Sequence, residues 1–169
     1  MSSTQVSGDA TTSASRSDAV ATRLEVVILP VADADRSKRF YEGLGWRLDA
    51  DIAVGDYHGV QMTPPGSGTS VIFGQGVTLA EPGSIESLIL AVDDIEVARK
   101  DLIAHGADVG EIFHDAHGSL GGGLVAGTAT RAPGLDPERR SYASYATFQD
   151  PDGNGWMLQE ITERLPGRV

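Results

Sequence analysis

The sequence has no cysteine, which excludes disulfides, thiolate metal sites and cysteine nucleophiles. It also has no apolar run near the roughly 20 residues that cross a bilayer, because LEVVILPVA is interrupted by Glu25 and Pro30. Positive charge is scarce, since 24 acidic residues against 13 Lys and Arg give a formal net charge of -11. This charge repels phosphate backbones. We therefore expect a cytoplasmic protein with neither nucleic acid nor membrane as a partner.

The length of 169 residues suits a single domain with a substantial hydrophobic core. Residues 1–22 are rich in Ser, Thr, Ala and Asp and contain no apolar stretch like that of a signal peptide. We expect a disordered N-terminal tail there and a folded domain over residues 23–165.

A strand and helix pattern occurs twice in the chain. The apolar segment Leu24–Val31 is typical of a buried strand, Asp33 can cap the helix that follows, and Gly45 ends that helix. A second apolar segment is followed by Asp94 and Gly106 in the same roles, and the difference between 94 and 33 is 61. Because the spacing is repeated without a gap, the sequence indicates two copies of one supersecondary unit.

Strand-like segments separated by turn signals follow each predicted helix. Each unit therefore reads β-α-β-β-β, which predicts an α+β fold with module one at about 23–80 and module two at about 84–162. A long Gly-rich loop is expected at about 114–140, and loops of this length are often functional. The strands expected after the helices are 46–51, 57–63 and 69–73 in module one, and 109–114, 141–149 and 156–162 in module two.

Two motifs, ADADRSKRFYEGLGW and DPDGNGWMLQE, resemble the vicinal oxygen chelate superfamily of glyoxalase I, bleomycin resistance proteins and extradiol dioxygenases. Together with the repeat, the resemblance covers about residues 23–162. It implies two tandem β-α-β-β-β modules that form a curled mixed sheet around a cleft. Dimerisation often completes this cleft in the family, so we expect a homodimer.

The resemblance also implies a divalent metal held by His, Glu or Gln on the first and last strands of the modules. At the corresponding positions this sequence has Val26, Ile72, Ser87 and Met157. A hydroxyl and a thioether are poor ligands for a divalent ion in water, and aliphatic side chains are none. Glu160 is nearby, but strand alternation turns it away from Met157. We therefore expect no metal and no other cofactor.

The same residues favour an apolar cleft for a small, planar ligand. Arg140 can clamp an acidic or phenolic group by charge-assisted hydrogen bonds, or it belongs to a solvated loop. The expected walls can equally be ordinary core residues of a curled sheet. The residues that we expect to line the cleft are Tyr57, Gln61, Phe73, Trp156 and Met157.

His114, Asp115 and His117, in FHDAHG, combine two imidazoles with a carboxylate. They form a polar strand end feeding a surface loop, a gate over a ligand, or a metal site. If the protein is an enzyme, His114, His117 and Tyr145 are the candidate catalytic residues, since a histidine can shuttle a proton near neutral pH.

Two functions of different classes follow. The first is a metal-independent binder of a small aromatic or metabolite ligand, like the bleomycin resistance proteins. The second is a lyase or isomerase of the glyoxalase type that acts on a small carbonyl compound with residues of the 114–140 loop. An extradiol dioxygenase ranks last, because no two-His-one-carboxylate set is found on the predicted strands.

Overall fold

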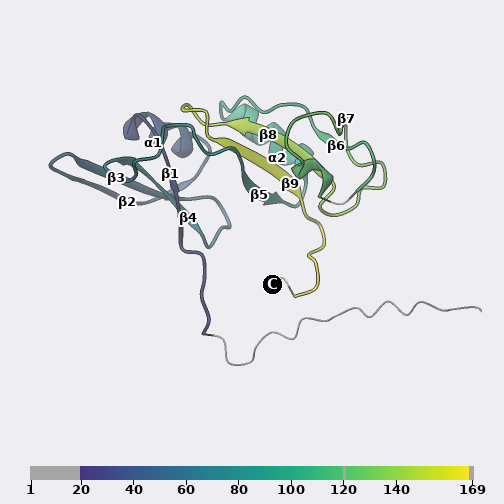
Figure 1. Cartoon of the computed structure of the whole chain (residues 1–169), viewed down its shortest axis with the longest axis horizontal. Helices are drawn as coiled ribbons and strands as arrows, with labels where there is room; N and C mark the ends of the chain where they lie inside the picture. Colours follow the sequence, from purple (N-terminus) through teal and green to yellow (C-terminus); the bar gives the residue numbers. More distant parts are fainter. Residues whose placement is uncertain (1–19, 120, 168–169) are drawn as a thin grey trace, which may run out of the picture.

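The computed structural model describes residues 20–119 and 121–167, so most of the predicted tail lies outside the described part. The first half of the chain forms one sheet and one helix (Figure 1). The sheet has the strand order β1-β4-β3-β2, with β1 parallel to β4 and the other pairs antiparallel. Its elements are β1 (Val26–Leu29), α1 (Ala34–Gly43), β2 (Arg47–Val54), β3 (Tyr57–Thr63) and β4 (Ser70–Gln75).

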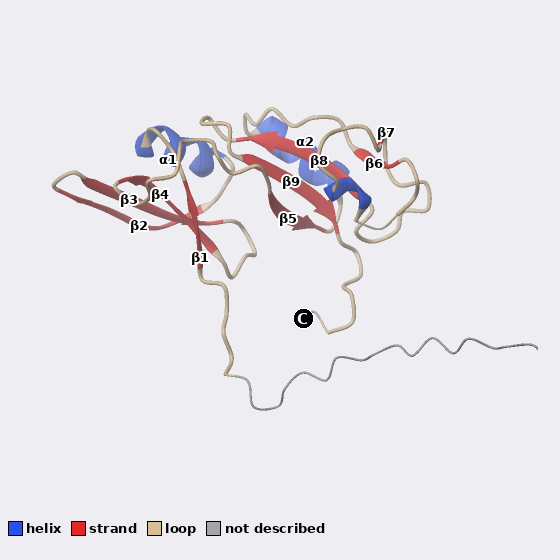
Figure 2. Ribbon diagram, in the orientation of Figure 1, coloured by secondary structure: helices blue, strands red, loops and turns tan. Residues whose placement is uncertain are grey.

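The second half forms a sheet of strand order β5-β9-β8-β6-β7, in which β5 and β9 are parallel. Figure 2 shows the two sheets side by side. Each helix packs on the sheet of its own half, α1 against β3 and β4, and α2 against β8 and β9. The elements are β5 (Leu88–Val92), α2 (Ile95–Ala104), β6 (Phe113–Asp115), the 3-10 helix η1 (Gly122–Leu124), β7 (Arg131–Pro133), β8 (Ser144–Gln149) and β9 (Gly155–Glu160).

The two helices confirm the repeat. Both begin after a capping aspartate: Asp33 accepts from the Arg36 amide, and Asp94 accepts from the amides of Glu96 and Val97. The first residues of α1 and α2, at 34 and 95, are 61 apart, as are the last, at 43 and 104. Each helix is followed by a glycine in the left-handed region, Gly45 and Gly106, which ends it at low steric cost.

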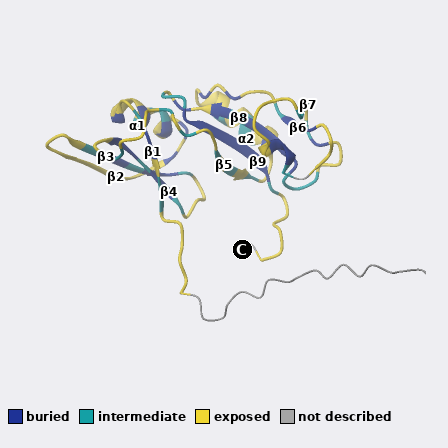
Figure 3. Cartoon of the chain, in the orientation of Figure 1, coloured by how far each residue is buried: buried dark blue, intermediate teal, exposed yellow. Residues whose placement is uncertain are grey.

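The main hydrophobic core lies between the helices and the sheets and continues from one half into the other (Figure 3). Tyr41 of α1 connects the two. Its hydroxyl donates to Asp150 and accepts from the Trp156 indole, both at 3.0 Å. Burial raises the pKa of Tyr41, so its hydroxyl keeps the proton that Asp150 accepts. Asn154 adds bonds of 2.9 Å to Asp150 and to the Pro30 carbonyl.

The segment 114–140 is more structured than the single loop that we predicted. It contains η1 and β7, and β7 pairs with β6 as a fifth strand. A hydrogen bond of 2.7 Å from the Ala116 amide to the Thr130 carbonyl extends this hairpin. A strand of three residues is too short to produce a periodic pattern, which is why the sequence did not show it. No helix in the described residues is long and apolar enough to cross a membrane.

Candidate functional site

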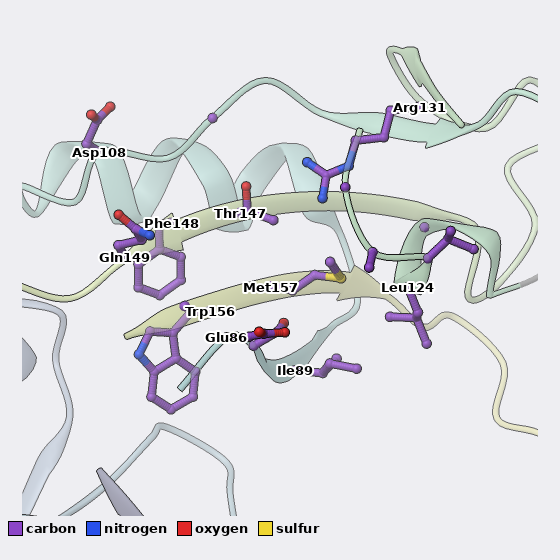
Figure 4. A pocket seen from close by; sticks show the side chains of 17 residues that line it. Glu86, Ile89, Asp108, Leu124, Arg131, Thr147, Phe148, Gln149, Trp156 and Met157 are labelled. Carbon is purple, nitrogen blue, oxygen red and sulfur yellow. The ribbon is translucent and has the colours of Figure 1, made fainter. Parts of the chain in front are cut away.

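A pocket of about 750 Å³ lies on the second sheet (Figure 4). Strand alternation decides which side chains reach it. Thr147 of β8 and Met157 of β9 are directly paired and line the pocket. The next pair, Ala146 and Leu158, points to the opposite face and is buried in the main core. The pocket therefore occupies the sheet face that α2 leaves uncovered.

The floor of the pocket is apolar. Met157 is paired across the sheet with Ile89 of β5, and both line the pocket. Beside them, Met157 joins Phe113 and Tyr145 in a small second core. The rings of Phe113 and Tyr145 stack with their centroids 5.5 Å apart. A flat, apolar ligand could bury its face against this floor.

Gly-rich backbone forms one wall of the pocket. A Cβ atom at Gly123 would come within 2.2 Å of the Tyr145 ring, so only glycine permits this close approach of η1. The following residues, Leu124 and Val125, line the pocket and are exposed. The Gly-rich composition thus allows η1 to lie directly on an aromatic ring.

The pocket carries charges of both signs at separate places. Arg131 extends from β7 towards the middle of the sheet (Figure 4), with its Cζ atom 4.0 Å from the centroid of the Phe113 ring. The Arg131 Nε is buried without a hydrogen-bond partner. Glu86 lies near Trp156, and Asp108 lies on the side of the view opposite Arg131. A ligand would therefore meet a cation on one side and carboxylates on others.

The structure brings together only part of the predicted cleft wall. Met157 and Trp156 both line the pocket, although Trp156 is mostly buried in the main core. Phe73 lies in that core because it is paired with Leu29, on the α1 side of the first sheet. Tyr57 and Gln61 belong to β3 of the first sheet and do not line the pocket.

The four positions where the family's metal ligands are expected are divided between the sheets. Val26 and Ile72 lie on β1 and β4, whereas Ser87 and Met157 line the pocket on the second sheet. Within residues 20–119 and 121–167, no group of three or more His, Asp or Glu side chains is placed to hold an ion.

The candidate catalytic side chains do not converge. His114 Nδ1 lies 2.9 Å from the Gly134 carbonyl oxygen, and His114 points to the sheet face opposite that of its neighbour Phe113. His117 is exposed and lies 3.8 Å from Asp115. Tyr145 is buried, which raises the pKa of its phenol, and its hydroxyl donates to the Tyr142 carbonyl.

Arg140 stabilises the polypeptide around it. Its guanidinium pairs with Asp136, with Nη2 2.6 Å from Oδ1, and donates to the Gly118 carbonyl at 2.9 Å. These hydrogen bonds lower the pKa of Asp136 to about 2. The donors that we expected to clamp a ligand are thus engaged within the protein.

Sequence reasoning missed Arg131. It lies in the Gly-rich segment, which shows no periodicity, and no motif marks it. One signal was available: apart from His117, Arg131 is the only ionisable residue between Asp115 and Asp136. A single charge in an otherwise apolar and Gly-rich stretch indicates a specific role more strongly than a charge on a solvated helix does.

Two similar halves, each with a helix on one sheet face, together with a pocket on an uncovered face, define an α+β fold built from a repeated β-α-β-β-β unit. The model of the Glyoxalase/Bleomycin resistance protein/Dioxygenase superfamily matches residues 23–158, and the chain belongs to this superfamily. The predicted resemblance and fold class are confirmed.

Solved structures with this fold include two from Streptomyces sp. CB03234. One is TnmS3, an antibiotic binding protein, which is 25% identical with a TM-score of 0.61 over 85% of this chain and 98% of that one. The other, a glyoxalase/bleomycin resistance protein, is 26% identical with a TM-score of 0.58 over 82% and 100%. A superfamily member from Sphaerobacter thermophilus, 23% identical over 83% and 98%, shares the fold with a TM-score of 0.57. No curated protein sequence matches the chain.

Proposed function

We propose that this protein binds a small aromatic or other planar metabolite without a metal. The pocket on the second sheet carries this proposal, because its volume of about 750 Å³ and its apolar floor of Met157 and Ile89 suit such a ligand. The similarity to TnmS3, an antibiotic binding protein, supports a binding function.

The chemistry of the pocket supports metal independence. The two family ligand positions that line it are Ser87 and Met157, and a hydroxyl with a thioether does not fit the hard or borderline ligation of a divalent ion. The other two positions, Val26 and Ile72, offer no donor atom at all. We do not propose the lyase or isomerase alternative, because His114 and Tyr145 point to opposite faces of one sheet.

A second copy of the chain is part of the proposal. The first sheet exposes apolar side chains on the face away from α1: Ile28, Ile52 and Val54 are 45%, 53% and 70% exposed. A contiguous exposed apolar face of this kind is typical of an interaction surface. Tyr57 and Gln61 lie on the same face, because Tyr57 is paired with Val54, and Gln61 with Ile72 beside Ile28. In such a homodimer, these two predicted ligand residues would lie at the interface between the two copies.

Binding is tested by titrating the protein, dialysed against a chelator, with planar aromatic probes and following tryptophan fluorescence. We expect saturable binding that added zinc or manganese does not change. Met157→Asp introduces a charge into the floor and should abolish binding, whereas Leu79→Asp, in a fully exposed loop position, should not. Binding that is lost with the chelator, together with a stoichiometric ion in elemental analysis, would contradict metal independence.

The dimer is tested by light scattering coupled to gel filtration. We expect the mass of two chains for the protein and of one chain for the double variant Ile52→Asp and Val54→Asp. Val97→Asp, on the exposed side of α2, is the control and should stay dimeric. A monomeric wild-type protein at micromolar concentration would refute the homodimer.

A further inference from the structure

We infer that Arg131 is the anchor for an acidic group of the ligand, so that the ligand class is flat aromatic acids. The inference rests on the proposed binding function and deepens it. It assigns the polar end of the pocket, whereas the proposed function depends on the apolar floor.

The guanidinium of Arg131 lies over an aromatic ring. Its Cζ lies 4.0 Å from the centroid of the Phe113 ring, and Phe113 in turn is stacked on Tyr145 at an interplanar angle of 23°. Cation–π contact of this kind attracts the guanidinium to the ring face and restricts its position. A guanidinium is planar and carries its N–H donors in a fork that matches the two oxygens of a carboxylate.

One donor of Arg131, the buried Nε, has no hydrogen-bond partner among the described residues. The ion pairs formed by arginines in this part of the described chain involve Arg139 and Arg140 rather than Arg131. Arg140, in the same part of the sequence, shows the contrast, since Asp136 and the Gly118 carbonyl accept its hydrogen bonds. A buried N–H of a charged group without an acceptor is destabilising, and a carboxylate that pairs with the part of the guanidinium facing the pocket would offset some of that cost through the shared positive charge.

The carboxylate opposite Arg131 in the strand register is engaged elsewhere. Asp115 is directly opposite Arg131 in the β6–β7 ladder, but its Oδ2 accepts from the amide and the hydroxyl of Ser119 at 2.9 and 2.7 Å. The cation that lies near Asp115 Oδ1 is His117, at 3.8 Å. Asp115 therefore leaves the N–H groups of Arg131 available to a ligand.

The other charges of the pocket orient such a ligand. Glu86 and Asp108 line the pocket away from Arg131 (Figure 4), and their carboxylates disfavour an anion near them. An aromatic acid that places its carboxylate on Arg131 extends its rings over Met157 and Ile89. A protein with a net charge of -11 repels anions in general, so selective binding of an acid requires a local cation such as this one.

The test compares three probes with the same ring system: pyrene-1-carboxylate, pyrene-1-carboxamide and 1-pyrenemethylamine. We expect the wild-type protein to bind the carboxylate about tenfold or more tightly than the carboxamide, because a charge-assisted pair is gained. Arg131→Met keeps the apolar stem on Phe113, and we expect it to weaken carboxylate binding by about tenfold to a hundredfold while carboxamide binding is unchanged. Arg131→Lys should give an intermediate loss, since it keeps the charge without the fork.

Arg39→Met is the matched control, because Arg39 is exposed on α1 and lies outside the pocket. The outcomes separate the two proposals. If the wild-type protein binds the carboxylate and the carboxamide equally, or the amine most tightly, the anchor is refuted and the binding function stands. If no probe binds, the binding function fails and the anchor with it. The wild-type ratio decides the question even if Arg131→Met does not fold.

Discussion

Arg131 and Arg140 lie in the same part of the chain and have different surroundings. Arg140 pairs with the buried carboxylate of Asp136, so its charge serves the local fold. Arg131 stacks on an aromatic ring and has a buried Nε without an acceptor, so its charge is available to the pocket. The difference arises from the neighbours of each guanidinium rather than from the residue type.

Asp136→Asn tests the structural pair. Hydrogen bonds from Arg140 lower the pKa of Asp136 from 3.8 to about 2, so the folded state binds the proton less readily than the unfolded state does. The pair of Asp136 with Arg140 therefore stabilises the folded state fully at pH values above 3.8, the pKa of the unfolded state. This stabilisation is lost as the pH falls from 3.8 to about 2, the pKa of the folded state. We expect the variant to be less stable at pH 7 by about 1–3 kcal/mol and to lose less stability over that acid range.

Urea unfolding at a series of pH values measures this effect. Glu138→Gln is the control, because Glu138 is exposed and lies 3.3 Å from the same guanidinium. Its effect on stability should be small. Equal acid sensitivity of the Asp136→Asn variant and the wild-type protein would show that the pair is not responsible.

At the level of single residues, the sequence predicts which side chains of a strand share a face, but not which face the helix covers. In β3, the period of two that a strand implies separates the buried Val60 and Met62 from Tyr57 and Gln61 on the opposite face. The sequence predicted Phe73 in the cleft wall, whereas the pairing of Phe73 with Val60 puts it on the helix side. Which face the helix covers depends on tertiary packing, which a period of two does not encode.

At the level of elements, the helices could be predicted because their signals are local. A capping aspartate, an apolar stripe and a left-handed glycine define both α1 and α2. The strand β7 could not be predicted, because its existence depends on pairing with β6 rather than on its own three residues. The 114–140 loop was expected to be functional, but the 3-10 helix η1 within it was not predicted, because three Gly-rich residues show no periodicity.

Gly123→Ala tests the contact of η1 with Tyr145. The added methyl would meet the ring at 2.2 Å, so η1 must move away from the sheet. We expect a loss of stability of about 1–3 kcal/mol and weaker binding of pyrene-1-carboxylate, since the wall of the pocket is displaced.

Thermal unfolding and the fluorescence titration together measure both effects. Gly68→Ala is the matched control, because a Cβ at Gly68 meets no atom within 4 Å and the residue lies outside this pocket. Unchanged stability and affinity in the Gly123→Ala variant would mean that η1 does not depend on this close approach.

At the level of the whole molecule, a buried polar network joins the two halves. Tyr41 of the first half bonds to Asp150 and Trp156 of the second, and Asn154 reaches back to the Pro30 carbonyl. Asp150, Asn154 and Trp156 all belong to the DPDGNGW motif, which leads into β9. The network therefore fixes the strand that carries Met157 relative to the first sheet.

Tyr41→Phe removes the central hydroxyl of this network. The Trp156 indole then loses its acceptor and Asp150 loses a donor, both within the core. We expect destabilisation of about 1–3 kcal/mol, the cost of leaving buried polar groups unpaired. Tyr57→Phe, at an exposed position on β3, should have almost no effect on stability.

Urea unfolding followed by tryptophan fluorescence measures both variants. Trp46 and Trp156, whose ring centroids are 5.2 Å apart, report on the junction of the two halves. A Tyr41→Phe variant as stable as the wild-type protein would show that the network contributes little to joining them.

Two hydrogen bonds close the segment that connects β6 to β7 and β8. One runs from the Ala116 amide to the Thr130 carbonyl, and the other from the Arg140 guanidinium to the Gly118 carbonyl. The entropy of closing a loop changes slowly with its length, so residues can be added between these ends at small entropic cost, provided that Gly123 keeps its contact with Tyr145. The same segment supplies one wall of the pocket. In evolution and in engineering, ligand preference can therefore change through this one segment while the rest of the domain stays the same.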